Sequence, residues 1–208
     1  MSYAHRVEAG DALAAQLKEY ADRADVIVLG LVRGGVPVAA RVAAALHAPL
    51  DVLVVRKLGV PWAPEVAFGA LGPGGVIVHN DDVESHLSTS DVAAVARAEG
   101  VELARRETLY RRDRPPLSLN GKVAIIVDDG IATGATARAA VAVSRSLGAR
   151  LVVVAVPVAA ADSLVELSGV ADAVVCPLVP PLFGAVSRFY RSFPQTTDDE
   201  VIALLHHT

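Results

Sequence analysis

The segment 122–147 restricts the fold more than any other part of the chain. It begins with an apolar run of strand length, passes through two aspartates and a loop of small residues, and continues as an alanine-rich helix that Gly148 ends. A short apolar run bounded in this way is typical of a strand buried on both faces, as in parallel sheets covered by helices. We therefore predict an α/β fold with a central, mostly parallel sheet flanked by helices.

The same order of elements occurs earlier in the chain and favours a single sheet. Residues 26–32 are predicted to form a buried strand, 36–46 an alanine-rich helix and 51–55 the next strand. Hydrophobic residues make up 53% of the chain and aromatic residues only 4%, which suits strands covered by alanine-rich helices. At 208 residues, the chain is expected to form one domain, 1–208.

Composition and charge argue against several classes of protein. The net charge of -4 disfavours a protein that coats nucleic acid. The longest apolar run, 151–161, is too short to cross a bilayer, and residues 1–9 lack the apolar core of a secretory signal. The single cysteine, Cys176, leaves no internal disulfide. We expect a cytoplasmic protein that contacts no membrane.

Two regions are expected to lie outside the sheet. A hairpin flap is predicted at about 60–82, because two strand-like runs there flank a turn of glycine and proline, and the helical pattern of 91–112 follows it. Five arginines in or after this helix are interleaved with glutamates, so a solvated face is predicted. They are Arg105, Arg106, Arg111, Arg112 and Arg114. The proline-rich region at about 176–196 is expected to form a small hood before a last helix that begins with a capping box at 197–200.

The loop after the strand at 122–127 carries the residues with the clearest chemistry. Asp128 and Asp129 stand at the carboxyl end of that strand, where ligands of open α/β sheets bind. The following small residues open a helix, so their N–H groups and the hydroxyls of Thr133 and Thr136 can surround a phosphate. The carboxylates can accept hydrogen bonds from sugar hydroxyls or hold the water shell of Mg²⁺. Together these groups indicate a site for ribose 5-phosphate.

Residues 124–136 resemble the phosphoribosyl-pyrophosphate (PRPP) motif of the type I phosphoribosyltransferases: apolar residues, two acids, and a small-Thr-Gly-small-Thr loop. The segment departs from the family pattern at Gly130, where an apolar residue is usual. The resemblance implies the family's Rossmann-like fold, a ribose-binding and catalytic role for Asp128 and Asp129, and Mg²⁺ bound with PRPP and with these two acids. It also implies a set of residues that bind the 5-phosphate. They are Ala132, Thr133, Gly134, Ala135 and Thr136.

Two further stretches are similar to parts of the same family. Residues 31–35, Leu-Val-Arg-Gly-Gly, resemble its pyrophosphate loop, which implies a cis peptide between Val32 and Arg33 and diphosphate binding by Arg33 and the two glycines. Residues 55–59, Val-Arg-Lys-Leu-Gly, are similar to the stretch before the mobile catalytic loop of adenine-type enzymes. The pyrophosphate-binding residues implied by both matches are Arg33, Gly34, Gly35, Arg56 and Lys57.

The resemblance also bears on acid–base chemistry and on the acceptor. Ala132 stands where 6-oxopurine enzymes of the family have an aspartate, so this chain is closer to the adenine-like or orotate-like branches, with Glu65 in the flap as the candidate catalytic base. A flat acceptor is expected under the hood, stacked on Phe183 or Tyr190. A homodimer is compatible with the resemblance, because many members of the family are dimers.

The implied activity is that of a glycosyltransferase, specifically a pentosyltransferase. It would move the 5-phosphoribosyl group from PRPP to a nucleobase or related small heterocycle and release pyrophosphate. Two alternatives stay open on the same fold: a regulatory protein that senses PRPP, and a hydrolase that uses water as the acceptor. The flap and the cations Arg56 and Lys57 favour turnover over sensing. The identity of the acceptor and the oligomeric state are left open.

Overall fold

The computed structural model describes residues 2–112 and 114–206. Its main sheet has five strands in the order β2-β1-β6-β7-β8, and every pairing in it is parallel. The strands are β1 (Val26–Leu31), β2 (Leu50–Leu53), β6 (Val123–Val127), β7 (Leu151–Ala155) and β8 (Ala173–Val175). The prediction of an α/β fold with a central parallel sheet is therefore confirmed.

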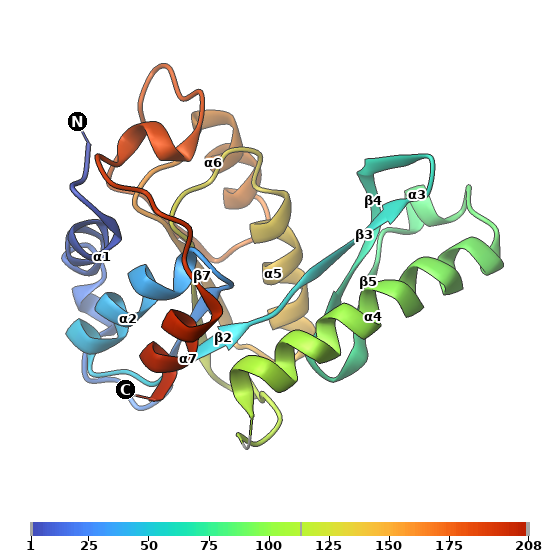
Figure 1. Cartoon of the computed structure of the whole chain (residues 1–208), viewed down its shortest axis with the longest axis horizontal. Coiled ribbons are helices and arrows are strands. Elements are labelled where there is room, and N and C mark those ends of the chain that lie inside the picture. The colour runs from blue at the N-terminus through green and yellow to red at the C-terminus, as the bar shows by residue number, and fades with distance from the viewer. Residues whose placement is uncertain (1, 113, 207–208) are drawn as a thin grey trace.

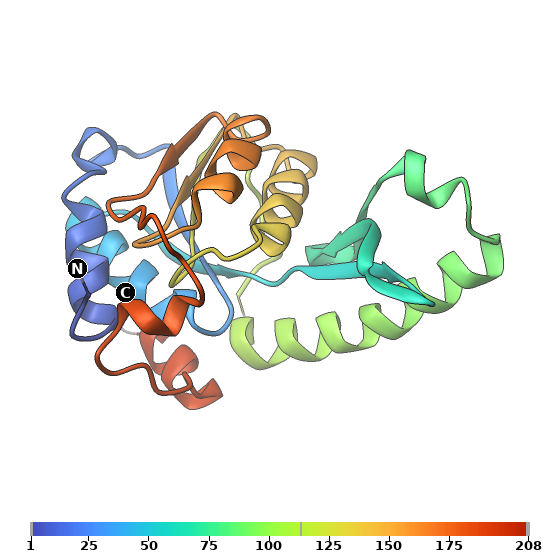
Figure 2. The same cartoon turned by 90° about the horizontal axis from the view of Figure 1, so that it is seen from above.

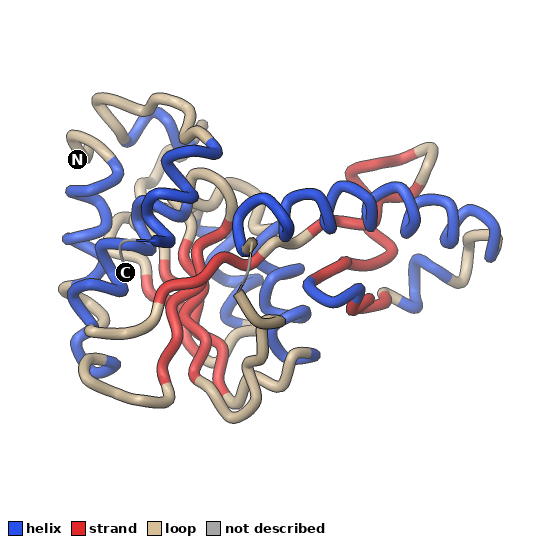
Figure 3. Tube along the Cα trace, turned by 60° about the horizontal axis from the view of Figure 1, so that its bottom comes forward, coloured by secondary structure: helices blue, strands red, loops and turns tan. Residues whose placement is uncertain are grey.

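Helices cover both faces of this sheet, as Figure 1 and Figure 3 show. On one face lie α1 (Arg6–Ala14) and α2 (Gly35–Leu46), with α7 (Asp198–His206) packed on α2. On the other face lie α5 (Ala135–Ser146) and α6 (Ala161–Ser168). Neighbouring residues of β6 alternate between the two cores, with Ile125 in the first and Ile126 in the second. The strand is thus buried on both sides, as its uninterrupted apolar sequence predicts.

A second sheet projects from the body as an arm, residues 56–111 (Figure 1, Figure 2). Its antiparallel strands are β3 (Arg56–Val60), β4 (Ala63–Gly72) and β5 (Val76–His79), with the short helices η2 (Pro73–Gly75) and α3 (Asp81–Glu84). The predicted hairpin is β4–β5. The arm reaches beyond the expected range of about 60–82 at both ends, because β3 pairs with β4 and the long helix α4 (Thr89–Arg111) returns beside the sheet. Phe68 and Leu103 belong to the core between sheet and helix.

A buried ion pair fixes the end of the arm to the main sheet. Arg111 donates from Nε to Asp51 Oδ1 at 3.1 Å and from Nη2 to Oδ2 at 3.0 Å, and the two side chains are 9% and 10% exposed. The prediction of a solvated arginine face holds for Arg105, which pairs with Glu102 on the surface, but is wrong for Arg111. Because Asp51 lies in β2, from which the chain enters the arm, both ends of the arm are held at one strand.

The C-terminal region forms the hood and the last helix. The hood contains η3 (Val186–Phe189) and packs its aromatic side chains against Tyr3, which precedes α1. The predicted capping box is present: the backbone N–H of Thr197 donates to Glu200 Oε2 at 2.7 Å, and the N–H of Glu200 donates to Thr197 Oγ1 at 3.2 Å. Near the N-terminus, η1 (Lys18–Tyr20) leads from α1 toward β1. Within residues 2–112 and 114–206, no helix is long and apolar enough to cross a membrane.

Replacement of Asp51 by alanine should destabilise the fold strongly, because it leaves the Arg111 guanidinium buried without its counter-charge. We expect the free energy of unfolding to fall by about 3 kcal/mol or more in urea denaturation. The matched control is Asp25→Ala, which removes an aspartate that also pairs with two arginines, Arg23 and Arg150, but at the surface. Its effect should stay below about 1 kcal/mol. Equal losses in the two variants would contradict a structural role for the buried pair.

Candidate functional site

The site lies where β1 and β6 end side by side. The two strands pair in parallel up to Gly30 and Val127, so the loops that follow them meet at the same edge of the sheet. The peptide bond between Val32 and Arg33 is cis, as predicted. A Cβ at Gly35 would lie 2.5 Å from the Val127 carbonyl oxygen. Only glycine therefore allows this predicted pyrophosphate loop to rest on the acid-bearing segment.

The predicted phosphate loop, residues 132–136, leads directly into α5. Gly134 caps the helix in the left-handed conformation, with φ 72°, and Thr133 and Thr136 are exposed. Ser163 Oγ donates to the Ala132 carbonyl at 2.6 Å, and Arg138 Nη1 of α5 donates to the Thr133 carbonyl at 3.0 Å. These bonds turn two carbonyl oxygens toward the protein. The first N–H groups of the helix and both hydroxyls are left for an anion.

Asp128 and Asp129 follow β6 in an environment that disfavours two negative charges. Loss of hydration and the neighbouring charge of Asp129 raise the pKa of Asp128 to about 8. Burial also raises the pKa of Asp129, against the opposing effect of Arg6, whose Nε and Nη2 donate to Asp129 Oδ2 at 2.9 and 2.8 Å. A perturbed acid pair at the carboxyl edge of an open sheet is typical of a functional site. Sequence reasoning missed Arg6, because no motif marks a lone arginine near the N-terminus.

The acid pair has carboxylate oxygens that suit a magnesium ion. Asp129 Oδ2 is engaged by Arg6, and Asp128 Oδ1 accepts the backbone N–H of Asp129 at 2.9 Å. Each carboxylate keeps a second oxygen that these bonds do not use. No group of three or more His, Cys, Asp or Glu side chains in the described part of the chain could hold a metal ion. Mg²⁺ suits such a site, since it is commonly held by one or two carboxylates together with substrate phosphates and water.

Two cavities are each lined by some of the predicted site residues. One, of about 410 Å³, is lined by Arg33, Gly34 and Asp129 together with Arg6 and the strap 193–196 of the hood. The other, of about 590 Å³, lies between the arm and α5 and is lined by Arg56, Lys57 and Thr136.

The arm lines the second cavity with residues of β3, β4 and α4. Arg56 Nε donates to Glu99 Oε2 at 2.6 Å, so the charge of Arg56 is balanced by an acid of α4. Lys57 follows Arg56 in β3, where the sequence interpretation placed the stretch before a mobile loop. Glu65 lies in β4, and its side chain is outside the part that the structure describes. Its role as a base stays a prediction.

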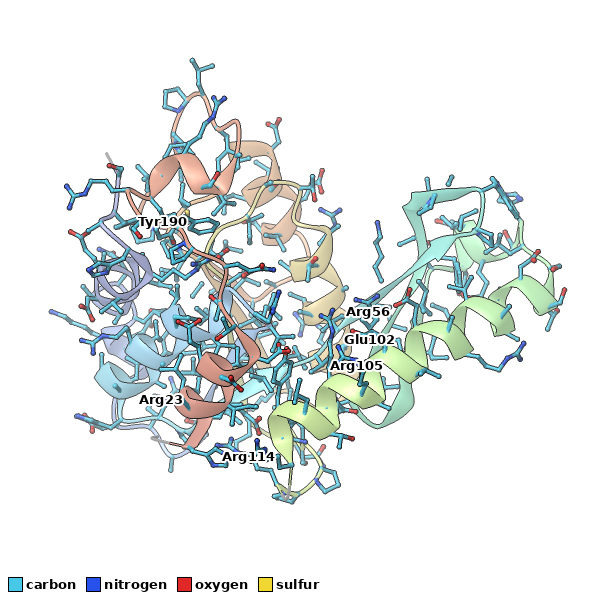
Figure 4. All side chains as sticks on the ribbon, viewed as in Figure 1. Arg23, Arg56, Glu102, Arg105, Arg114 and Tyr190 are labelled. Atoms are coloured by element: carbon cyan, nitrogen blue, oxygen red, sulfur yellow. The ribbon has the colours of Figure 1, made fainter. Side chains whose placement is uncertain are left out.

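The aromatic side chains of the hood pack mainly on each other. Tyr190 is 6% exposed, its ring lies 4.9 Å from that of Phe193, and its hydroxyl donates to the Asp129 carbonyl at 2.6 Å. Phe183 packs against Phe189 at 5.4 Å. Figure 4 shows Tyr190 in the body, well away from Arg56. Of these rings it is Phe193, rather than the predicted Phe183 or Tyr190, that lines the cavity beside Asp129.

The departure from the family motif at Gly130 has a structural counterpart. A Cβ at this position would lie 2.6 Å from the side chain of Val186, which belongs to η3 in the hood, and 3.0 Å from Val158. Val186 therefore occupies the space that an apolar side chain at position 130 would need. This contact is invisible in the sequence, because the two residues are 56 positions apart and belong to no common motif.

The raised pKa of Asp128 predicts how stability without ligand depends on pH. Because the folded chain keeps a proton that the unfolded chain releases, the contribution of protonated Asp128 to the free energy of unfolding is fully present below about pH 4 and is lost as pH rises to about 8. One proton corresponds to a slope of at most about 1.4 kcal/mol per pH unit. Urea denaturation of Asp128→Asn should show a smaller slope than wild type across this range. Asp162→Asn, an exposed control in α6, should leave the slope unchanged; an unchanged slope in Asp128→Asn as well would contradict the assignment.

Comparisons with known proteins identify the family of this chain and agree with its fold. Residues 3–190 match the family model of the phosphoribosyl transferase domain. Two Mycobacterium tuberculosis proteins, from strains CDC 1551 / Oshkosh and H37Rv, are each named "Putative phosphoribosyl transferase" and are 55% identical to this chain over 202 residues. The match covers 96% of this chain and 45% of theirs, so the chain spans about half the length of these relatives. The crystal structure of TT1426 from Thermus thermophilus is 40% identical, with a TM-score of 0.93 over 100% of this chain and 99% of that one. The chain belongs to the phosphoribosyl transferase domain family.

Proposed function

We propose that this protein transfers the 5-phosphoribosyl group of PRPP to a nitrogen heterocycle and releases pyrophosphate. One observation carries the proposal: the acid pair, the phosphate loop and the glycine-rich loop converge at the ends of β1 and β6. A diol, a monoester phosphate and a diphosphate are the three polar parts of PRPP. Carboxylates, a helix N-terminus and close-packed glycines are groups that suit these three parts, in that order.

The residues would act mainly by binding and by balancing charge. Thr133, Thr136 and the first N–H groups of α5 would hold the 5-phosphate, and Asp128 and Asp129 would accept hydrogen bonds from the ribose hydroxyls. The backbone at Gly34 and Gly35 would approach the diphosphate as it leaves the anomeric carbon. Developing negative charge on that group would be stabilised by Arg33 and by cations of the arm.

Magnesium bound with PRPP would add positive charge at the leaving diphosphate. Arg56 and Lys57 line the cavity that also contains Thr136, so the arm borders the phosphate side of the site. Arg56 is paired with Glu99, and a role in binding diphosphate would require it to exchange that partner.

Glu65 is proposed as the acid–base residue. Glu65→Gln should then lower kcat more than it raises KM for PRPP.

The acceptor would enter the cavity beneath the hood. Its wall contains Phe193 and the polar side chains of Gln195 and Thr196, which suits a flat ring that carries hydrogen-bonding groups. Anchoring by a few polar groups would give the enzyme its acceptor preference, because a buried donor or acceptor left unpaired costs about 1 to 3 kcal/mol.

Pyrophosphate release from Mg²⁺ and PRPP, measured across purines, pyrimidines, related heterocycles and water alone, tests the proposal. We expect release that depends on one acceptor class, with kcat/KM about 10- to 100-fold lower in Asp128→Asn because charge-assisted hydrogen bonds to ribose are lost. The control Asp162→Asn changes an exposed acid of α6 and should keep wild-type activity.

The other outcomes would replace the proposal with a different function. Release at the same rate with water alone and with every heterocycle would indicate a hydrolase. Binding of PRPP without release in the presence of any acceptor would indicate a sensor. Equal activity of Asp128→Asn and wild type would contradict the placement of ribose at the acid pair.

A further inference from the structure

Arg6 connects three parts of the site through one guanidinium group. Its Nε and Nη2 donate to Asp129 Oδ2 at 2.9 and 2.8 Å, and its Nη1 donates to the Pro194 carbonyl at 2.6 Å. The Phe193 ring covers the guanidinium, with the central carbon 3.8 Å from the ring centroid. The acid comes from the PRPP-like motif, the proline and phenylalanine from the hood, and Arg6 itself from the first residue of α1.

The contact is buried and directional, unlike the surface ion pairs of the chain. The side chains of Arg6 and Asp129 are 10% and 14% exposed. Both hydrogen bonds end on the same carboxylate oxygen, Oδ2, and therefore leave Oδ1 to the rest of the site. In a site with little water, such charge-assisted bonds fix the rotamer of the carboxylate as well as stabilise its charge.

The predicted pyrophosphate loop packs directly against the Arg6–Asp129 ion pair. A Cβ at Gly34 would collide with Asp129 Oδ2 and would lie 3.4 Å from Arg6 Nη2. Asp129 Oδ2 thus sits between the Arg6 guanidinium and the backbone of Gly34. From the hood, the Tyr190 hydroxyl donates a hydrogen bond of 2.6 Å to the backbone carbonyl of Asp129.

We propose that Arg6 is a positioning residue for the PRPP site, and the inference rests on the proposed function. It holds Asp129 so that Oδ1 accepts a ribose hydroxyl, and it holds Pro194 so that the strap 193–196 keeps its place over the acceptor cavity. Arg6 acts through these two residues and not on the reacting atoms. Lysine cannot replace it fully, since an ammonium group cannot reproduce the planar set of donors that reaches Asp129 and Pro194 together.

A double-mutant cycle on Mg²⁺–PRPP binding, measured by calorimetry, tests the role. We expect Arg6→Gln and Asp129→Asn each to weaken binding at least about 10-fold. The double variant should bind within about 2-fold of Asp129→Asn alone, because Arg6 acts through that carboxylate. Arg6→Lys keeps the positive charge and serves as the test variant if Arg6→Gln does not fold. Its affinity for Mg²⁺–PRPP should lie between those of wild type and Asp129→Asn. Arg41→Gln is the control, since Arg41 joins α2 to Asp11 of α1 at the surface, and should bind as wild type.

Wild-type affinity in both Arg6→Gln and Arg6→Lys would overturn the inference. So would losses that multiply in the double variant, because they would mean that Arg6 and Asp129 act independently. Either result would leave the proposed function standing, since wild type would still bind PRPP. Failure of the wild-type protein itself to bind Mg²⁺–PRPP would overturn the proposed function and this inference with it.

Discussion

The parallel pairing of β1 with β6 is the contact on which the candidate site depends. Its register runs from Val26 opposite Val123 to Gly30 opposite Val127, so both strands end at the same height. The helices that follow, α2 and α5, then leave toward opposite faces of the sheet. Two loops that start side by side and diverge create the crevice in which open α/β sheets bind ligands.

Charge at this crevice makes the motif depend on distant parts of the chain. Burial at the end of an apolar strand takes hydration from both carboxylates and raises the pKa of each, and the neighbouring charge of Asp129 raises the pKa of Asp128 further. Arg6, in α1, offsets part of this cost by donating to the Asp129 carboxylate. Tyr190, in the hood, donates to the backbone carbonyl of the same residue. The remaining imbalance is what a ligand with hydroxyl donors or a bound cation would relieve. On the proposed function, Mg²⁺ and PRPP would bring both.

The parts predicted from sequence were those determined by local pattern. The buried strand before Asp128, the end of the following helix at Gly148, the cis bond at Val32–Arg33 and the capping box of the last helix follow from, or match, contiguous residues. The family itself could be recognised from such segments, because a phosphate loop needs its residue types at fixed spacing.

The parts that escaped prediction arise from contacts between residues far apart in the chain. Arg6 and Asp129 are 123 positions apart, and Arg111 looks like its solvated neighbours until Asp51 is placed beside it. The extent of the arm depends on α4 packing along the small sheet, which periodicity alone does not give. Phe183 and Tyr190 are stacking candidates by residue type; in the structure both pack with other rings of the hood, and stacking on an acceptor stays a prediction.

A crystal structure of the protein with Mg²⁺ and PRPP bound would test the central claim most directly. The account predicts the 5-phosphate within hydrogen-bonding distance of Thr133 and Thr136, the ribose hydroxyls at the carboxylates of Asp128 and Asp129, and the diphosphate against Gly34. PRPP bound in the reverse direction, or away from the ends of β1 and β6, would contradict it.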